Sequence, residues 1–199
     1  MKKKIAITGG IGSGKSEAIK IIKELGFPVF SCDEIYKEII FSKEYVQRIE
    51  ENFPTCVKNG IIDRKELSAI VFANREKRDL LNSLSHPLIM EKLLTEMETV
   101  PEGLIFAEVP LLFENGFESM FDHIIVIKRS KNNRIQSVIK RNKLSEEELQ
   151  KRMAAQFDYS KENLETISKS HSLKIIKNEE DLSLFKKSIV NEISNLEQL

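Results

Sequence analysis

A glycine-rich stretch that ends in lysine and serine, residues 9–16, is the part of this sequence best suited to bind phosphate. It reads GGIGSGKS and matches the phosphate-loop pattern G-x-x-x-x-G-K-[ST] at each required position. Glycines let the backbone bend so that amide N–H groups converge on an anion. Lys15 would then reach the β- and γ-phosphates of a nucleotide, and the Ser16 hydroxyl would hold Mg²⁺. The expected nucleotide contacts are Gly10, Ile11, Gly12, Ser13, Gly14, Lys15, Ser16 and Glu17.

Asp33 is the candidate catalytic carboxylate. It directly follows residues 29–32, which are expected to form a short second strand, one strand over from the phosphate loop. Ligands of open α/β sheets bind at the carboxyl ends of the strands, where an acid can orient the proton of an attacking hydroxyl. Asp is also a favoured helix cap, and a helix is expected from Glu34. Residue types and position leave both roles open.

Two further acidic or basic features could take part in the chemistry. The segment 128–158 is rich in Lys and Arg, so as a mobile lid it could bring Arg134, Arg141 or Arg152 onto a triphosphate. For any single arginine an ordinary solvated surface position is the simpler interpretation, but we expect at least one of the three to contact phosphate. Glu108 ends an apolar run and could support Mg²⁺ through water, or could instead be a structurally paired acid.

The apolar pattern predicts the elements that must position these groups. Nearly continuous apolar runs at 104–109 and 123–127 are typical of buried parallel strands, and shorter or weaker runs at 5–7, 29–32 and 173–176 predict three more strands. Between about 41 and 100 the apolar residues recur at helical spacing, with Gly60 and Pro87 as breaks and no expected strand. The sequence therefore predicts an α/β fold of three layers with a five-stranded parallel sheet, a helical insertion and a helical lid. The expected core is 1–34, 101–128 and 161–199, the insertion is 35–100, and the lid is 129–160.

Composition narrows the class of protein. Lys and Arg together number 31, as do Asp and Glu, and this zero formal charge argues against a nucleic-acid-binding protein. The two cysteines have no metal-binding spacing, and the first apolar run is too short for a signal peptide. No apolar stretch approaches the roughly 18 residues of a membrane span. We expect a cytoplasmic protein that is a monomer or weak oligomer, with small-molecule partners and neither nucleic acid nor membrane.

A phosphate loop alone does not separate a kinase from a GTPase switch or an ATPase. No Asp in this chain begins a D-x-x-G sequence, and residues 142–145 lack the Asp that would read guanine. These absences weaken the GTPase alternative. A kinase for a small metabolite or nucleoside monophosphate, and a nucleotide-dependent switch, both stay open at this point.

Five motifs in order extend the comparison to nearly the whole chain. They are Thr8–Ser16, Gly60–Arg64 with Leu67 and Val71-Phe72, Leu84–Ile89, Val109–Glu114, and Arg141 with Arg152–Gln156. Together these motifs resemble those of the dephospho-CoA kinase family. The resemblance implies a five-stranded parallel core, a helical substrate-binding insertion and a lid.

The resemblance also implies an activity and a set of roles. The implied reaction transfers the γ-phosphoryl group of MgATP to the ribose 3′-hydroxyl of dephospho-CoA, which gives CoA and ADP. Asp33 falls on the family's catalytic base, Lys15 and Arg141 on its phosphate-binding cations, and Asn178 near its adenine pocket. The chain departs from the family pattern at Ser31, where the first acid of a D-A-D triplet is usual.

Overall fold

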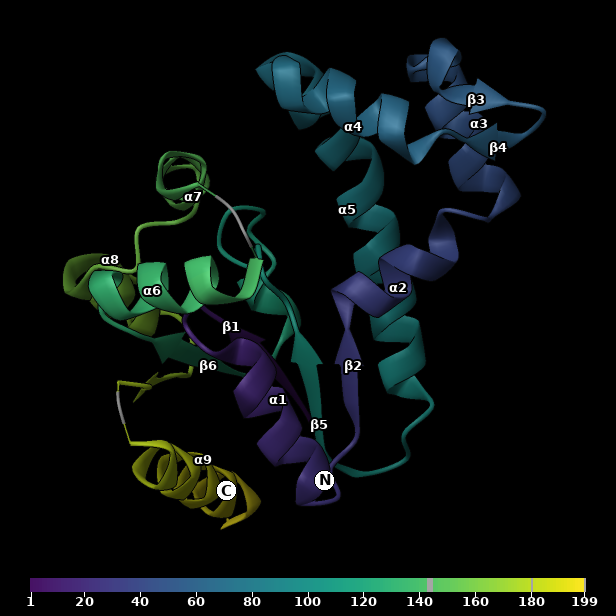
Figure 1. Ribbon diagram of the computed structural model, residues 1–199. Helices are drawn as coiled ribbons and strands as arrows, with labels where there is room; N and C mark the ends of the chain where they lie inside the picture. Colours follow the sequence, from purple (N-terminus) through teal and green to yellow (C-terminus); the bar gives the residue numbers. More distant parts are fainter. Residues whose placement is uncertain (143–144, 180, 199) are drawn as a thin grey trace. The chain divides into compact units, whose positions relative to one another are not determined.

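The computed structural model describes residues 1–142, 145–179 and 181–198, apart from the side chains of Arg141 and Asn142. The chain forms two compact units. One contains residues 1–30 and 99–199, and the other contains residues 31–98 (Figure 1). Each unit is described separately below.

The larger unit is built on a five-stranded sheet with the strand order β2-β5-β1-β6-β7. The strands are β1 (Lys2–Thr8), β2 (Val29–Ser31), β5 (Gly103–Glu108), β6 (His123–Lys128) and β7 (Leu173–Lys177). β1 pairs in parallel with both β5 and β6, and β6 pairs in parallel with β7. The expected parallel five-stranded sheet is confirmed. The expectation that the second strand lies directly beside the first is wrong, because β5 is inserted between β1 and β2.

Two helices cover one face of this sheet, α1 (Lys15–Glu24) and α9 (Leu182–Gln198), which lie side by side in Figure 1. Alternate residues of a strand point to opposite faces, so Ile5 and Ile7 join this core while Ala6 faces the other side. From the helices, Ile22 and Phe185 are buried in the same cluster. All three of these β1 residues are fully buried, which explains why the strand reads as a continuous apolar run.

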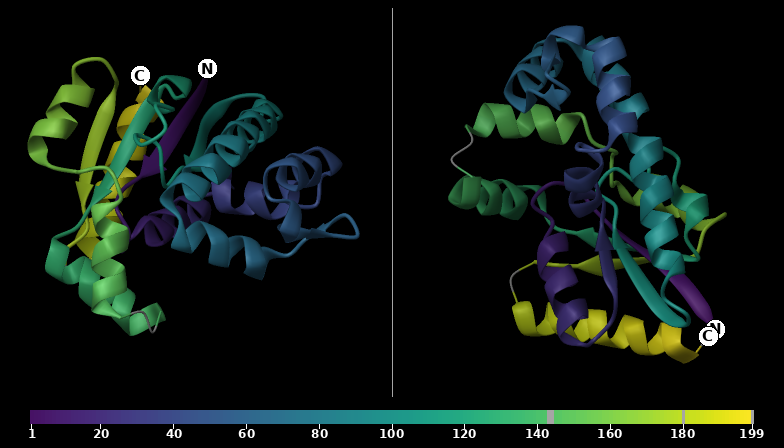
Figure 2. Two further views of the ribbon diagram at one scale, coloured as in Figure 1. Left: turned by 90° about the horizontal axis from the view of Figure 1, so that it is seen from above. Right: turned by 90° about the vertical axis from the view of Figure 1, so that its right-hand side faces the viewer.

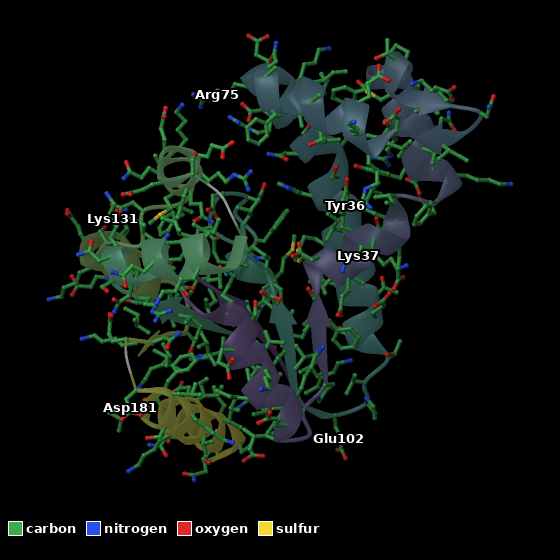
Figure 3. The ribbon with its side chains drawn as sticks, viewed as in Figure 1. Tyr36, Lys37, Arg75, Glu102, Lys131 and Asp181 are labelled. Carbon is green, nitrogen blue, oxygen red and sulfur yellow. The ribbon has the colours of Figure 1, made fainter. Side chains whose placement is uncertain are left out.

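The helix ends follow from local chemistry. α1 ends at Glu24, and Gly26 follows the C-cap Leu25; the φ of 88° at Gly26 allows its N–H to donate to Lys23 O while the N–H of Phe27 donates to Ile22 O. This is the Schellman arrangement that favours glycine. At the start of α9, Asp181 Oδ1 accepts a hydrogen bond of 2.8 Å from the N–H of Ser183; Figure 3 labels Asp181 ahead of that helix.

Three more helices belong to this unit, α6 (Lys131–Asn142), α7 (Glu146–Ala154) and α8 (Lys161–Ser168), together with the short 3₁₀ turn η2 (Glu118–Met120). α6 and α7 lie side by side (Figure 2). Ser145 caps α7, since its hydroxyl accepts from the N–H of Glu148 at 3.2 Å. Most of the basic segment is therefore helical, in agreement with the helical segment expected there.

The smaller unit is mainly helical. It comprises α2 (Cys32–Ile39), α3 (Lys43–Asn52), η1 (Pro54–Cys56), β3 (Val57–Lys58), β4 (Ile61–Ile62), α4 (Arg64–Ala73) and α5 (Arg75–Glu98). The antiparallel hairpin β3–β4 corrects the expectation of no strand in this region. Its turn is Asn59-Gly60, and both residues have positive φ (53° and 72°), as a two-residue hairpin requires.

Pro87 does not break a helix, because α5 runs through it. Pro cannot donate a helical N–H bond, so packing must offset the loss. On this helix Ser85 is buried, donates to Leu81 O at 2.7 Å and shares a hydrogen bond of 2.7 Å with the Tyr45 hydroxyl. Buried residues such as Leu93 and Met97 continue the packed face on the far side of Pro87.

Candidate active site

The phosphate loop connects the carboxyl end of β1 to the first turn of α1. Gly12 has a φ of 77°, a conformation that side chains other than glycine rarely adopt. A Cβ at this position would also lie 2.7 Å from the carbonyl oxygen of Arg134. The backbone at Gly12 is thus bent, and packed so closely against Arg134, that the shape of the loop depends on the absence of a side chain at this position.

The start of α1 is suited to bind an anion. Its N-cap is Gly14, which has no side chain to accept a hydrogen bond from the first turn. The first N–H groups of a helix have no acceptor within it, and they lie at the positive end of the helix dipole. Together with the loop these groups fit a polyphosphate, which needs a backbone cradle free of Cβ atoms.

Lys15 and Ser16 lie where the phosphate-loop pattern requires. The Lys15 Nζ donates to the carbonyl oxygen of Gly9 at 2.7 Å and to that of Gly10 at 3.4 Å, so the ammonium group lies across the loop. Ser16 is exposed on the first turn of α1, and its hydroxyl is a hard oxygen ligand of the type that Mg²⁺ prefers. Glu17 follows in the same turn.

Three side chains from distant parts of the chain hold the outside of the loop. Gln156 Oε1 accepts from the N–H of Ile11 at 2.7 Å, and Arg134 Nε donates to the Ile11 carbonyl oxygen at 2.8 Å. Asn178, which follows β7, donates from Nδ2 to the carbonyl oxygen of Ser13 at 2.9 Å. Of the predicted residues, the structure therefore brings Arg134 and Asn178 to the loop.

Tyr159 is a part of this site that sequence reasoning missed. Its hydroxyl lies 3.3 Å from Thr8 Oγ1, and its ring packs against Phe113 and Phe157, with centroids 6.0 and 5.2 Å away. Burial raises the pKa of Tyr159 to about 12, so the phenol stays protonated and available for hydrogen bonding. Nothing in its local sequence marks it, because the contact joins residues far apart in the chain.

The packing of the Phe113, Phe157 and Tyr159 rings also gives a structural role to the motif at residues 109–114. In the run 109–114, Phe113 supplies a ring 4.8 Å from that of Phe157, and Glu114 Oε1 accepts from the N–H of Phe157 at 2.8 Å. Phe113 and Glu114 therefore hold Phe157 in place, in the segment that leads from the end of α7 to the phosphate loop. Gln156, which contacts the loop, directly precedes Phe157.

A cavity of about 280 Å³ adjoins the loop. Its lining carries the cationic side chains of Lys128, Arg129 and Arg134 against the carboxylate of Asp158. Ser13 also lines it, and within the described part of the chain the buried Ser13 hydroxyl has no hydrogen-bond partner. The excess of positive charge is what an anionic ligand at the loop requires.

Asp33 lies in the smaller unit, on the first turn of α2, and is exposed. The interpretation of Asp33 as the helix cap is wrong, because α2 begins at Cys32 and its N-cap is Ser31. The helix therefore starts earlier than the residue types suggested, and Asp33 is left with its side chain in the first turn. An acid there is favoured by the helix dipole.

The remaining predicted residues lie in the larger unit. Arg141 is on α6, but its side chain is outside the described residues. Arg152 is exposed on α7. Glu108 is the last residue of β5, half-buried and in register with Ile7 of β1. It therefore sits beside the strand that leads into the loop.

The comparisons with known proteins decide the family. The family model described as dephospho-CoA kinase matches residues 3–182. The chain belongs to the dephospho-CoA kinase family. A dephospho-CoA kinase of Fusobacterium nucleatum is 37% identical over 186 residues, which are 92% of this chain and 93% of that protein. A dephospho-CoA kinase of Geobacillus kaustophilus is 36% identical over 77% of this chain and 79% of its own length.

Solved structures agree with this membership of the dephospho-CoA kinase family. The dephospho-CoA kinase of Campylobacter jejuni is similar over 100% of this chain and 98% of its own, with a TM-score of 0.69 and 31% identity. The protein TT1252 of Thermus thermophilus is similar over 98% of both chains, with a TM-score of 0.80 and 29% identity. A deoxyadenosine kinase of M. mycoides, at 17% identity and a TM-score of 0.51, shares the fold alone.

Proposed function

We propose that this protein is a dephospho-CoA kinase, which transfers the γ-phosphoryl group of ATP to the ribose 3′-hydroxyl of dephospho-CoA and releases ADP and CoA. The observation that carries the proposal is the phosphate loop with Lys15 folded across it, in a chain that the family model matches over residues 3–182. The loop is a suitable binding site for the phosphate donor ATP, and membership of the family identifies dephospho-CoA as the acceptor.

The larger unit would bind the donor. Backbone N–H groups of residues 10–17, apart from the Ile11 N–H that donates to Gln156, would hold the β- and γ-phosphates together with the Lys15 ammonium, with Asn178 near the base. The exposed Ser16 hydroxyl would hold Mg²⁺, which when bound neutralises charge on the phosphate oxygens. Arg141 would add a second cation to the transferred group.

Asp33 would act on the acceptor. Phosphoryl transfer needs an alcohol oxygen in line with the leaving group, and an acid that accepts its proton. An exposed carboxylate on the first turn of α2 is able to accept a hydrogen bond from the 3′-hydroxyl and take its proton as the new P–O bond forms. The insertion 35–100 would bind dephospho-CoA, and the segment 129–160 would act as the lid.

No helix in the residues described is long and apolar enough to cross a membrane. Among the same residues, no three His, Cys, Asp or Glu side chains gather in a way that could hold a metal ion. A cytoplasmic location and a monomer or weak oligomer remain predictions of the sequence.

The decisive experiment is a panel of acceptors. ADP release would be measured with saturating MgATP and with dephospho-CoA, AMP, adenosine or shikimate as the acceptor. We expect dephospho-CoA alone to stimulate ADP release strongly, and CoA to form in equal amount. Stimulation by a different acceptor would indicate another small-molecule kinase, and slow hydrolysis that no acceptor stimulates would indicate a nucleotide-dependent switch.

A further inference from the structure

Both backbone polar groups of Ile11 are held by side chains that lie more than a hundred residues away in the sequence. The N–H donates to Gln156 Oε1 at 2.7 Å, and the carbonyl oxygen accepts from Arg134 Nε at 2.8 Å. Ile11 is in the middle of the phosphate loop, between two glycines. A segment with so little side-chain packing of its own takes its shape from hydrogen bonds of this kind.

Gly10 shows how closely Arg134 fits the loop. Unlike Gly9, Gly12 and Gly14, Gly10 does not have a positive φ, so a left-handed backbone conformation is not what favours glycine there. A Cβ built on Gly10 would nevertheless overlap the Arg134 guanidinium, lying 2.7 Å from its Cζ. The space that a side chain at position 10 would need is therefore filled by Arg134.

We propose that Arg134 and Gln156 are positioning residues that hold the phosphate loop in the shape that receives ATP, and that glycine at residue 10 leaves the Arg134 guanidinium the space it needs to reach Ile11. The inference deepens the proposed function and rests on it for the identity of the nucleotide. It assigns Arg134 a role different from the direct phosphate contact considered from the sequence. In this role the guanidinium donates a hydrogen bond to the backbone of the loop and does not move onto the triphosphate with a lid.

The surroundings of Arg134 support this role. The side chain is partly withdrawn from water, and burial lowers the pKa of its guanidinium, although an arginine stays charged at any ordinary pH. A partly buried charge is retained where its hydrogen bonds are made in a fixed geometry, as with Ile11 here. Gln156 is fixed in turn by the adjacent Phe157, whose N–H donates to Glu114 and whose ring packs against Phe113.

The steric part of the proposal is tested by a cycle of Gly10→Ala and Arg134→Ala, alone and combined. In the presence of Arg134, the added methyl group must either displace the guanidinium from Ile11 or shift the loop. We expect Gly10→Ala to weaken MgATP binding by about tenfold, the size of one lost charged hydrogen bond. In the Arg134→Ala background the methyl group has room, so adding Gly10→Ala should change the Kd by less than about twofold.

Gly12→Ala is the matched control for this cycle. Its Cβ would meet the backbone carbonyl oxygen of Arg134 and the Val138 side chain, and its φ is positive. Truncating the Arg134 side chain removes none of these three obstacles. We expect Gly12→Ala to weaken ATP binding equally in both backgrounds. An equal loss from Gly10→Ala in both backgrounds would overturn the proposal.

The same cycle is measurable without nucleotide or acceptor. The clash is a property of the free protein, so Gly10→Ala should lower the unfolding midpoint in the presence of Arg134 and leave it unchanged in the Arg134→Ala background. This readout stays valid if dephospho-CoA proves not to be the acceptor. It also covers the case in which a variant binds ATP too weakly to measure, and additive midpoints would again overturn the proposal.

Gln156→Ala tests the second contact, with Gln150→Ala as its control. Gln150 is an exposed residue of α7 whose amide hydrogen-bonds to Glu146 at 3.1 Å, so its loss leaves the loop untouched. We expect Gln156→Ala to raise the KM for ATP by about tenfold with little change in the KM for the acceptor, because the loop holds only the donor. Equal changes in both KM values, or the same result from Gln150→Ala, would show a general loss of structure instead.

Discussion

The Lys15 ammonium group donates to the carbonyl oxygen of Gly9 at 2.7 Å, across the loop that connects them. The interaction holds a positive charge against the backbone of the loop. A triphosphate offers charged oxygens in place of a neutral carbonyl, and charge-assisted hydrogen bonds are about twice as strong as neutral ones. The binding energy of the nucleotide should therefore depend strongly on this one side chain.

Replacing Lys15 with Ala should weaken ATP binding itself. Loss of hydrogen bonds to a charged group costs about 1.5–3 kcal/mol, which corresponds to a Kd for ATP that is roughly 10- to 150-fold higher. Titration of the free protein with ATP measures this directly. Lys20→Ala is the control, since Lys20 is exposed and lies 3.9 Å from Glu24, and its Kd should match that of the wild type.

Replacing Asp33 with Asn should leave ATP binding intact and remove most of the turnover. An amide is nearly the same size as the carboxylate but does not accept the proton of the attacking alcohol. We expect kcat to fall by about 10²- to 10⁴-fold, the usual contribution of a general base. The neighbouring acid gives a matched control, because Glu34 is also exposed on the first turn of α2 and Glu34→Gln removes the same charge. Equal kcat values for the two variants would contradict the catalytic role of Asp33.

The packing of α9 on the sheet predicts a large loss of stability for Phe185→Ala. Phe185 is 1% exposed and belongs to the core between the sheet, α1 and α9. Truncating a buried Phe costs about 3–5 kcal/mol in the free energy of unfolding. Denaturant unfolding would measure the loss. Leu184 is the adjacent residue and is 61% exposed, so Leu184→Ala should change stability by less than about 0.5 kcal/mol.

A buried pair on the same, sheet-facing side of α9 makes stability depend on pH. His123 of β6 and Glu192 of α9 are both nearly buried, with Nε2 and Oε1 3.2 Å apart. Nδ1 of His123 lies 2.7 Å from the Ser172 hydroxyl, and Lys174 Nζ lies 3.5 Å from Glu192 Oε2. Burial lowers the pKa of His123 and outweighs the attraction of Glu192, while Lys174 and Lys3 lower this pKa further.

The sign of the pH effect follows from that lowered pKa. The unfolded chain protonates His123 near its ordinary pKa of about 6.5, whereas the folded chain takes up this proton only at lower pH. The contribution to stability is therefore complete above about pH 6.5 and is lost as the pH falls through the folded pKa. We expect the unfolding midpoint of the wild type to fall more steeply below pH 6.5 than that of His123→Gln. His171→Gln, which keeps His123, should retain the wild-type slope.

Much of the donor site was predictable because its signals are local. The phosphate-loop residues are consecutive, and the pattern of glycines with Lys15 and Ser16 specifies the bend, the cation and the hydroxyl without reference to any other segment. The strands β1, β5 and β6 were predictable for a similar reason, since runs of consecutive buried residues are apolar without interruption. The hairpin at Asn59-Gly60 carries a local signal as well, but strands of only two residues each are too short to show an alternating pattern.

What the sequence determined by itself was the presence of a phosphate loop, the five strands and the family motifs, since each is written in residues that are close together in the chain. Only the tertiary structure decided which strand lies beside β1, which side chains hold Ile11, and that Pro87 lies within a helix. The reason is physical. The strand order and the contacts of Arg134, Gln156 and Tyr159 depend on groups separated by many residues. The free energy that stabilises these contacts comes from packing and burial in the folded chain, which a pattern of neighbouring residues does not indicate.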